Sequence, residues 1–354
     1  MIYVLVIAAG LWVLGREMQA PVRARWLMIA ILYVAVLVLL ILLPDGHPMQ
    51  QALGGSFGEW LLLGGLAAAI FGYRNVLTRL RKFARTSTAE TIPDTPKGAF
   101  QGAEIERYAR HIMLREIGGP GQKKLKQSKV LVVGAGGLGS PACMYLAAAG
   151  VGTIGIIDDD VVENTNLQRQ IAHTDDRIGM PKVFSAQASM KTLNPYVDVR
   201  PFHRKLTQDI AAELIADFDL VLDGTDNFET RYLVNEACVQ AGKPLISGAL
   251  TQWEGQVSLF DPAKDAPCYR CVFPEAPAAG LAPSCAEAGV VGPITGVIGS
   301  MMAVEAIKTI AGAGDGLAGR MLIYDALYSE VRVIGLNRRE DCETCGAGHP
   351  SAES

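Results

Sequence analysis

The 354-residue sequence predicts an α/β domain whose Rossmann-like, mostly parallel sheet continues into antiparallel strands, preceded by about three membrane-spanning helices. Two observations indicate the sheet. An apolar run at 129–133 is followed at once by a glycine-rich loop, and a second run at 153–158 ends in aspartate. A third observation indicates the helices: half of the residues are hydrophobic and the mean hydropathy is +0.23, yet charged residues are concentrated after about position 74. The apolar excess therefore lies near the N-terminus.

Three apolar segments make up the predicted membrane anchor, residues 1–85. Residues 26–43 carry no charge, and as a helix they would be about 27 Å long, close to the roughly 30 Å hydrocarbon core of a bilayer. Segments 2–14 and 53–73 are weaker candidates on their own, because the first is short and the second contains Glu59 and several glycines. The charges that flank these two segments strengthen the prediction that both cross the membrane.

If these segments cross a membrane, the basic residues that flank them all lie on the same side of it. The first connection contains Arg16, Arg23 and Arg25, residues 44–59 contain no Lys or Arg, and five basic residues follow Tyr73. The positive-inside rule then predicts an outside N-terminus and a multi-pass protein of the cell inner membrane with a cytoplasmic catalytic domain. A cleaved signal peptide is the alternative for the first segment, but its charges follow the apolar run instead of preceding it.

The remaining boundaries follow from composition. Residues 86–102 are rich in Thr, Pro and Gly and predict a linker, residues 103–346 form the predicted catalytic domain, and 347–354 form a tail. A net charge of −4 gives no general basic surface, so no nucleic-acid partner is expected. The basic cluster at 74–85 is better explained as a stop-transfer flank that contacts anionic lipid.

The loop after the first strand has the composition of a phosphate-binding turn. Gly134, Gly136, Gly137 and Gly139 lie between that strand and a helix of small residues, where glycine lets the backbone approach phosphate at a helix N-terminus. Asp158 ends the next strand, at the position where a ribose is usually held. This pattern alone suits NAD, FAD or ATP.

The residues that follow favour ATP. Asn166 and Arg169 come after the acidic strand end, Lys182 opens a helix, and Asp226 follows a further strand at 220–222. Ligands in an open parallel sheet lie beyond the carboxyl ends of the strands, so these side chains are expected to converge on one crevice. A triphosphate with Mg²⁺ needs such cations and a second carboxylate, whereas a nicotinamide does not. Taken singly, the two cations could be solvated surface residues and Asp226 a helix N-cap.

Two Cys-x-x-Cys pairs predict a metal site. Cys268 and Cys271 form one pair, Cys342 and Cys345 the other, and each spacing presents two thiolates to one tetrahedral ion. We predict a closed structural zinc site that fixes the strands within 320–337 to the domain. Two redox disulfides are the alternative, which a reducing cytoplasmic compartment disfavours.

Together, these motifs resemble the adenylyltransferases that activate ubiquitin-like sulfur carriers in molybdopterin and thiamine synthesis, relatives of the enzymes that activate ubiquitin-like modifiers. The resemblance covers about residues 102–346. It rests on residues 106–110, 134–140, 158–170, 181–182, 222–227, 268–271, 285–289 and 342–345. The first hundred residues lie outside the pattern, because the familiar members are soluble.

The resemblance implies a role for each site residue. Asp158 would bind ribose, while Asn166, Arg169 and Lys182 would bind phosphates. Asp226 would bind Mg²⁺. Arg110 would reach the ATP of the other subunit, which implies a homodimer. The implied reaction is attack of a carrier's C-terminal glycine carboxylate on the α-phosphate of ATP. That carboxylate is already ionised at neutral pH, so catalysis needs positive charge and positioning but no general base.

Four further features have more than one possible role. Cys285 lies in a loop where family members can carry the activated carrier as a thioester or acyl disulfide, and an inert loop thiol is the alternative. His111 and His173 are expected to be structural, and the apolar helix near 291–311 is expected to be buried or to face a dimer partner instead of forming a fourth span. The remaining thiols, those of Cys143 and Cys238, are expected in the core.

The sequence therefore predicts ATP-dependent adenylation of a small ubiquitin-like sulfur carrier that ends in Gly-Gly, with the small subunit of molybdopterin synthase preferred. The sulfur donor is not indicated. Alternatives are a thiamine-pathway carrier adenylyltransferase and a tRNA threonylcarbamoyladenosine dehydratase. Two others come from different classes: a dinucleotide-dependent oxidoreductase, which needs no such set of cations and carboxylate, and an inactive membrane scaffold, which should have lost some of that set.

Overall fold

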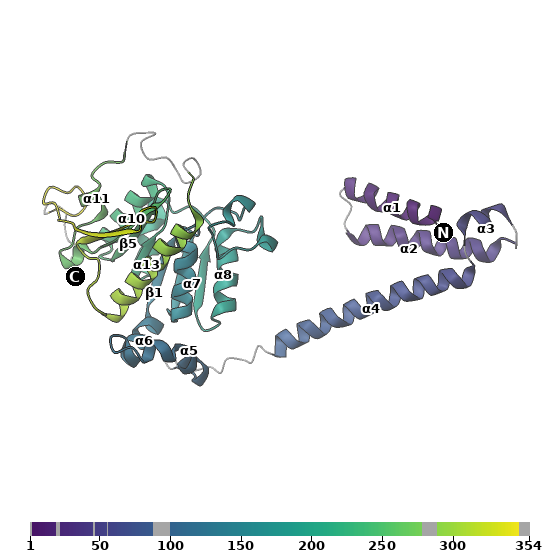
Figure 1. Cartoon of the computed structure of the whole chain (residues 1–354), viewed down its shortest axis with the longest axis horizontal. Helices are drawn as coiled ribbons and strands as arrows, with labels where there is room; N and C mark the ends of the chain where they lie inside the picture. Colours follow the sequence, from purple (N-terminus) through teal and green to yellow (C-terminus); the bar gives the residue numbers. More distant parts are fainter. Residues whose placement is uncertain are drawn as a thin grey trace. The chain divides into compact units, whose positions relative to one another are not determined.

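The computed structural model describes residues 2–18, 22–44, 47–54, 56–87, 100–277 and 289–346. The chain divides into two compact units, Met1–Asp94 and Thr95–Ser354, and each is described by itself (Figure 1). Cys285 and most of the predicted linker lie outside the described residues.

Helices make up the N-terminal unit: α1 Ile2–Glu17, α2 Val22–Leu42, α3 Pro48–Leu53 and α4 Phe57–Ser87. Helices α1 and α2 lie side by side as a hairpin (Figure 1). A small cluster of buried apolar side chains joins α1, α2 and α4, made of Val4, Val36, Leu40 and Trp60.

The prediction of about three membrane spans is wrong. Among the described N-terminal helices only α2 is long and apolar enough to cross a membrane, over Ala24–Leu42. Helix α1 has 16 residues, and its length of about 24 Å falls short of the hydrocarbon core. Helix α4 is long, but Glu59, four glycines and the basic residues of its second half dilute its apolar stretch.

The second unit is built on one eight-stranded sheet. Its strands are β1 Lys129–Val133, β2 Thr153–Ile157, β3 Asp198–Phe202, β4 Leu220–Asp223, β5 Leu245–Leu250, β6 Glu254–Phe260, β7 Arg320–Asp325 and β8 Glu330–Gly335, in the order β3-β2-β1-β4-β5-β6-β7-β8. Strands β1 to β5 are parallel and β5 to β8 pair antiparallel, which confirms the predicted mixed sheet. The central strands are apolar runs because helices cover both of their faces.

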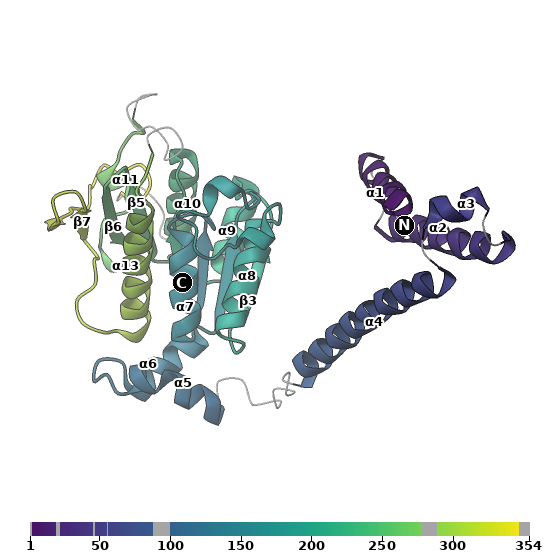
Figure 2. The ribbon, with the colours of Figure 1, turned by 45° about the vertical axis from the view of Figure 1, so that its right-hand side comes forward.

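The long helices after residue 138 cover the two faces of the sheet, whereas the two helices before residue 128 lie at one end of this unit (Figure 2). The helices of this unit are α5 Gly102–Ile112, α6 Gly118–Gln127, α7 Gly139–Ala149, α8 Lys182–Leu193, α9 Gln208–Ala216, α10 Phe228–Gln240, α11 Tyr269–Val272 and α13 Gly292–Ala311, with short 3₁₀ turns η1 Asn164–Asn166, η2 Asp175–Arg177 and η3 Pro262–Lys264. One core cluster contains Leu146 of α7 and Met302 of α13, and the other contains Ile215 of α9 and Val234 of α10.

Helix α13 is a core helix, as expected. It meets the same length and composition test as α2, but half of it is buried against α7, β5 and β6. The chain leaves the adjacent strands β1 and β4 toward opposite halves of the sheet, and a crevice is expected where such a strand order reverses.

Candidate functional site

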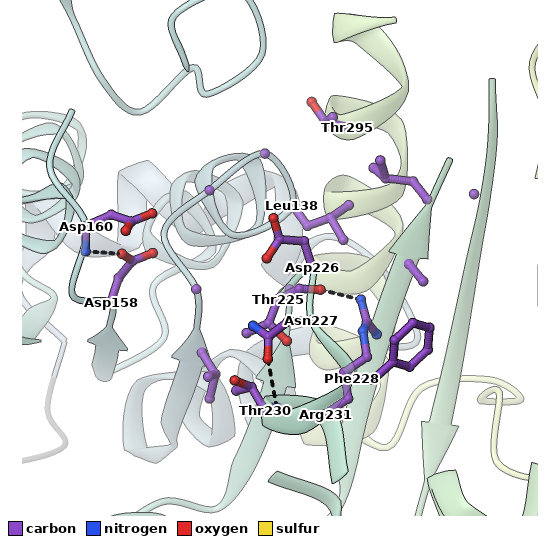
Figure 3. A pocket seen from close by; sticks show the side chains of 18 of the residues that line it. Leu138, Asp158, Asp160, Thr225, Asp226, Asn227, Phe228, Thr230, Arg231 and Thr295 are labelled. Carbon is purple, nitrogen blue, oxygen red and sulfur yellow. Dashed lines mark hydrogen bonds between the residues drawn. The ribbon is translucent and has the colours of Figure 1, made fainter. Parts of the chain in front are cut away.

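A cavity of about 890 Å³ lies at the carboxyl ends of β1, β2 and β4, at this reversal of strand order (Figure 3). It brings together most of the predicted site residues: Gly134, Gly136, Gly137, Asp158, Asn166, Arg169, Lys182 and Asp226. These residues are spread over more than ninety positions of the sequence. They meet because the order of the strands in the sheet places the ends of β1, β2 and β4 side by side.

The loop between β1 and α7 requires glycine at two positions. Gly134 has φ of +93°, a left-handed conformation, and a Cβ added to Gly139 would lie 1.8 Å from the Gly134 carbonyl oxygen. Gly139 was predicted to contact the nucleotide, but it does not line the cavity. Its lack of a side chain instead lets α7 begin directly behind the loop. Gly137 and Leu138 line the cavity at the N-terminus of α7, where backbone N–H groups favour an anion.

The Asp158 carboxylate links this loop to the residues after β2. Its Oδ2 accepts a hydrogen bond from the Ala135 N–H at 2.7 Å. Its Oδ1 accepts from the Asp160 N–H at 2.8 Å (Figure 3). Burial raises the pKa of Asp158, and the positive charge of Lys182 opposes that rise. The carboxylate is thus held at the cavity wall with acceptor capacity left for hydroxyl groups.

Lys182 is not a solvated surface residue. Its side chain is only 7 % exposed, and its Nζ lies 2.7 Å from Oδ2 of Asp160, whose carboxylate is 66 % exposed. Because that partner faces solvent, the ammonium group is held in place without being enclosed. It can turn part of its donor capacity toward a phosphate in the cavity.

The other two predicted phosphate contacts are positioned by turn η1. Asn166 is buried, and its Oδ1 accepts from the Glu163 N–H at 3.1 Å. The half-buried Arg169 donates from Nη1 to the Thr165 carbonyl at 3.0 Å, and its own carbonyl accepts from Thr295 Oγ1 of α13 at 3.1 Å. The guanidinium still has donors that can reach a ligand.

Asp226 presents a free carboxylate to the cavity. It is exposed, and in the described part of the chain no donor reaches its oxygens. Its neighbour Asn227 is the N-cap of α10, accepting from the Thr230 N–H at 2.9 Å (Figure 3). The N-cap alternative for Asp226 is therefore wrong, and the carboxylate remains available for a cation.

Sequence reasoning missed a buried guanidinium beneath this loop. Nη1 of Arg231 donates to Ser247 Oγ at 3.0 Å and lies 3.6 Å from the fully buried Asp223 carboxylate. Its Nη2 donates to the carbonyls of Thr225 and Gly248, the latter at 2.8 Å. The side chain thereby fixes the backbone next to Asp226. Its position one helical turn after the N-cap asparagine does not by itself identify Asp223 as its partner.

We expect Arg231→Leu to destabilise a fragment of residues 95–354 by about 3–5 kcal/mol, because it leaves the Asp223 carboxylate buried without its cation. Urea denaturation measures this loss. Arg231→Lys keeps the charge but not the fork of donors, so its free energy of unfolding should lie between those of wild type and Arg231→Leu. A Leu variant within about 1 kcal/mol of wild type would contradict this role.

The two histidines near the motifs are structural, as expected. His173 Nε2 lies 2.9 Å from the Ala135 carbonyl, which can only accept, so Nδ1 must accept from Ser185 Oγ at 3.0 Å. This neutral ring ties α8 to the glycine loop, and burial lowers its pKa. His111 contacts Oε1 of Gln122 at 3.2 Å.

The lowered pKa of His173 predicts a pH effect on stability. Below pH about 6.5 the unfolded chain binds a proton there that the folded chain does not, so this residue lowers the free energy of unfolding as the pH falls. Between pH 7 and 5.5, wild type should therefore lose more stability than His173→Gln, by at most about 1.4 kcal/mol per pH unit. Urea denaturation of both proteins at both pH values tests this prediction. Equal losses of stability in wild type and His173→Gln would refute it.

Arg110 does not join the cavity of its own chain. It is exposed near the end of α5 and is absent from the residues that line the cavity. Its predicted contact with the ATP of another subunit stays a prediction, as does the role of Cys285.

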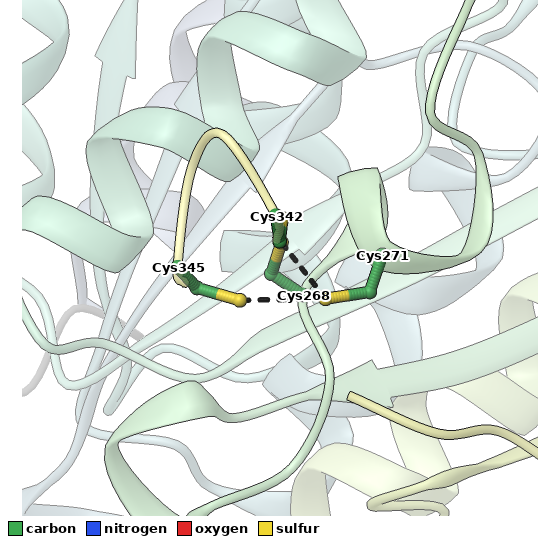
Figure 4. Close-up of side chains that lie close together, drawn as sticks. All are labelled: Cys268, Cys271, Cys342 and Cys345. Carbon is green, nitrogen blue, oxygen red and sulfur yellow. Dashed lines mark hydrogen bonds between the residues drawn. The ribbon is translucent and has the colours of Figure 1, made fainter. Parts of the chain in front are cut away.

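The four paired cysteines meet in one buried cluster (Figure 4). The Sγ atom of Cys268 lies 3.8 Å from that of Cys271 and 3.6 Å from that of Cys342, and the Cys271 and Cys345 sulfurs are 3.4 Å apart. Four Zn–S bonds of 2.3 Å in a tetrahedron require S–S separations of about 3.8 Å. The Arg339 N–H also donates to Cys271 Sγ at 3.5 Å, as expected around thiolate ligands. The residues thus fit a closed zinc site.

The two other described thiols belong to the core, as expected. Cys143 and Cys238 are buried within α7 and α10. Burial raises the pKa of the Cys143 thiol to about 12, which keeps it protonated and unreactive.

Comparison with known proteins agrees with this geometry. A model described as the ThiF family matches residues 108–344. The chain is 46 % identical over 250 residues to the SAMP-activating enzyme E1 of Haloferax volcanii, covering 71 % of this chain and 92 % of that protein. It is 47 % identical over 247 residues to the sulfur carrier protein adenylyltransferase of Thermus thermophilus, covering 69 % and 91 %. The crystal structure of E. coli MccB with MccA-N7isoASN has the same fold, with a TM-score of 0.61 and 24 % identity over 68 % of this chain and 74 % of that one.

Proposed function

Since the chain belongs to the ThiF family and is an adenylyltransferase, we propose that it uses ATP to adenylate the C-terminal glycine of a small ubiquitin-like sulfur carrier. The names of its relatives support this substrate class, because one activates SAMP and the other adenylates a sulfur carrier protein. Within that class we propose the small subunit of molybdopterin synthase, with the thiamine-pathway carrier as the second candidate.

The shape of the cavity carries the proposal. Beyond the nucleotide half it continues past Asp226 to the antiparallel strands, where Leu250, Gly255 and Ile323 line it together with Phe273. That second half combines these apolar side chains with the polar residues Thr251, Gln252, Glu254 and Gln256. Apolar contacts together with hydrogen-bonding groups beside a strand end suit an extended peptide tail. A C-terminal carboxylate can therefore approach the phosphates of a nucleotide bound at the glycine loop.

The side chains suit adenylyl transfer. The carrier carboxylate oxygen forms a bond to the α-phosphorus, and the bond to the bridging oxygen breaks, releasing pyrophosphate. Both reactants are anions, so Arg169 and Lys182 lower the barrier by offsetting the charge that gathers on the phosphates. Asp226 would hold a Mg²⁺ ion, which neutralises phosphate charge when bound. No proton has to be removed from the nucleophile.

We further propose a homodimer in which Arg110 extends to the nucleotide of the partner, supported by its exposure and its absence from its own cavity. We also propose that the catalytic unit faces the cytoplasm, where ATP is available and thiols stay reduced.

Exchange between ATP and labelled pyrophosphate tests the proposed reaction. We expect exchange in the presence of a carrier ending in Gly-Gly and none with the same carrier lacking those two residues. Comparing molybdopterin-synthase and thiamine-pathway carriers decides between the two candidates. Absence of exchange with every carrier, despite Mg²⁺ and a folded enzyme, would overturn the proposal.

We expect Cys285→Ala to leave this exchange within about twofold of wild type, because adenylation needs no thiol nucleophile. Only the later step, transfer of the activated carrier toward a sulfur donor, should be lost. Formation of a carrier thiocarboxylate measures that step. Loss of the exchange itself in Cys285→Ala would show that this division of roles is wrong.

A further inference from the structure

Helix α2 of the N-terminal unit is apolar on all sides. Over Ala24–Leu42 its mean hydropathy is 2.7, and only 11 % of that stretch is buried within the protein. The side that faces away from its neighbours is as apolar as the packed side. Its exposed large apolar residues are Trp26, Leu27, Ile31, Val34, Val38, Ile41 and Leu42.

Neighbouring helices extend this apolar surface. Helix α1 exposes Val6, Ile7 and Leu14, and α4 exposes Leu62 and Leu66. A site for one protein partner would be an apolar patch bordered by polar residues, whereas helices that are apolar on every side are covered all round.

Two polar side chains at the contacts between the described helices of this unit are satisfied internally. The Tyr33 hydroxyl on α2 donates to the Trp60 carbonyl at 2.7 Å, and Trp60 Nε1 donates to the Gly54 carbonyl at 2.9 Å. Helix α4 approaches α2 closely there, because a Cβ on Gly64 would lie 2.0 Å from the Tyr33 hydroxyl oxygen. Internal satisfaction and small residues at helix contacts are what a hydrocarbon environment requires.

Amphipathic side chains gather where α1 meets α2. The rings of Trp12 and Trp26 meet edge to face with centroids 5.2 Å apart, and the Arg25 guanidinium lies 5.7 Å from the Trp12 ring centre. Arg16 is exposed at the same end of the hairpin. Tryptophan and arginine in this combination are typical of the headgroup level of a membrane.

We propose that a lipid bilayer covers the N-terminal unit, that α2 crosses its hydrocarbon core, and that the cluster of Trp12, Arg25 and Trp26 lies among the headgroups. The matched relatives align with only about 70 % of the chain, so this is a property beyond the shared catalytic unit. It does not depend on the proposed reaction.

The test uses the purified full chain and vesicles of phosphatidylcholine with phosphatidylglycerol. After reconstitution the chain should float with the vesicles and stay with them through an alkaline carbonate wash. Release by carbonate or by high salt would show surface attachment and overturn the proposal. A chain that is soluble without lipid, or that needs another protein to cover the helices, would overturn it as well.

A matched pair of variants places the crossing on α2. Val34 and Val304 are both 56 % exposed, the first near the middle of α2 and the second on α13 of the catalytic unit. Val34→Glu should shift the partition from membrane to aqueous phase by about 100-fold, because a charge at the centre of a span is costly. Val304→Glu should not change it. An equal effect of both, or none of Val34→Glu, would contradict a crossing by α2.

Discussion

Replacing Asp226 by Ala is expected to lower the rate of ATP–pyrophosphate exchange by at least about 100-fold. The Asp226 carboxylate follows β4, faces the cavity, and is not engaged by any donor in the part of the chain that the structure describes. Without this carboxylate, the proposed Mg²⁺ ion would lose a ligand. Less positive charge would then offset the negative charge of the phosphates. Folding should be unaffected, because an exposed side chain without partners is removed. The measurement is the exchange rate at saturating ATP and carrier, with circular dichroism as the check on folding.

Glu229→Gln supplies the control for this variant. Glu229 lies in the first turn of α10 next to the same loop, but its side chain is 83 % exposed and it does not line the cavity. The Gln substitution removes one negative charge nearby, together with its 3.6 Å ion pair to Lys205 at the cavity, but leaves the proposed Mg²⁺ ligand in place. A similar loss of exchange in both variants would mean that overall charge, and not a specific ligand, accounts for the effect.

Among the substitutions proposed for this protein, Cys342→Ser is expected to cause the largest loss of stability. The thiol belongs to the buried four-cysteine cluster, which joins the turn after β8 to α11. Zinc binding to four thiolates contributes folding free energy of about 10 kcal/mol or more in small zinc domains, comparable with the whole stability of a domain. The variant should contain no zinc and should unfold at a lower temperature than wild type, by more than 10 °C.

Metal analysis and thermal unfolding of wild type, Cys342→Ser and Cys143→Ala test this prediction together. Cys143 is another buried thiol, in α7 and away from the cluster, so its variant should retain zinc. A strong chelator should reproduce the effect of Cys342→Ser on wild type. Full stability in the absence of zinc would refute a structural metal.

Much of the site could be predicted because strand ends and glycine loops mark it in the sequence. Asp158 and Asp226 each follow an apolar run, and the order of a parallel sheet brings such positions together. Arg231 and its buried partner Asp223 could not be found this way. Their contact depends on how α10 packs over β4 and β5, which no local pattern specifies.

In the membrane region, by contrast, the sequence led to more predicted spans than the structure supports. Apolar content and flanking charges suggested three spans, but the short first segment, 2–14, becomes a helix of only 16 residues, which is still too short to cross. The true bounds of a helix depend on its turns and its packing, and these decide whether a segment is long enough to cross. Helix α13 illustrates the same ambiguity, because composition alone does not separate a span from a core helix.

Transfer of label from ATP to the carrier tests the central claim most directly. With ATP labelled at the α-phosphate, we predict label on the intact carrier, together with release of pyrophosphate. No label should appear from γ-labelled ATP or on a carrier that lacks its terminal glycine. Label from the γ-phosphate, or α-label on the shortened carrier, would contradict adenylation of a C-terminal carboxylate.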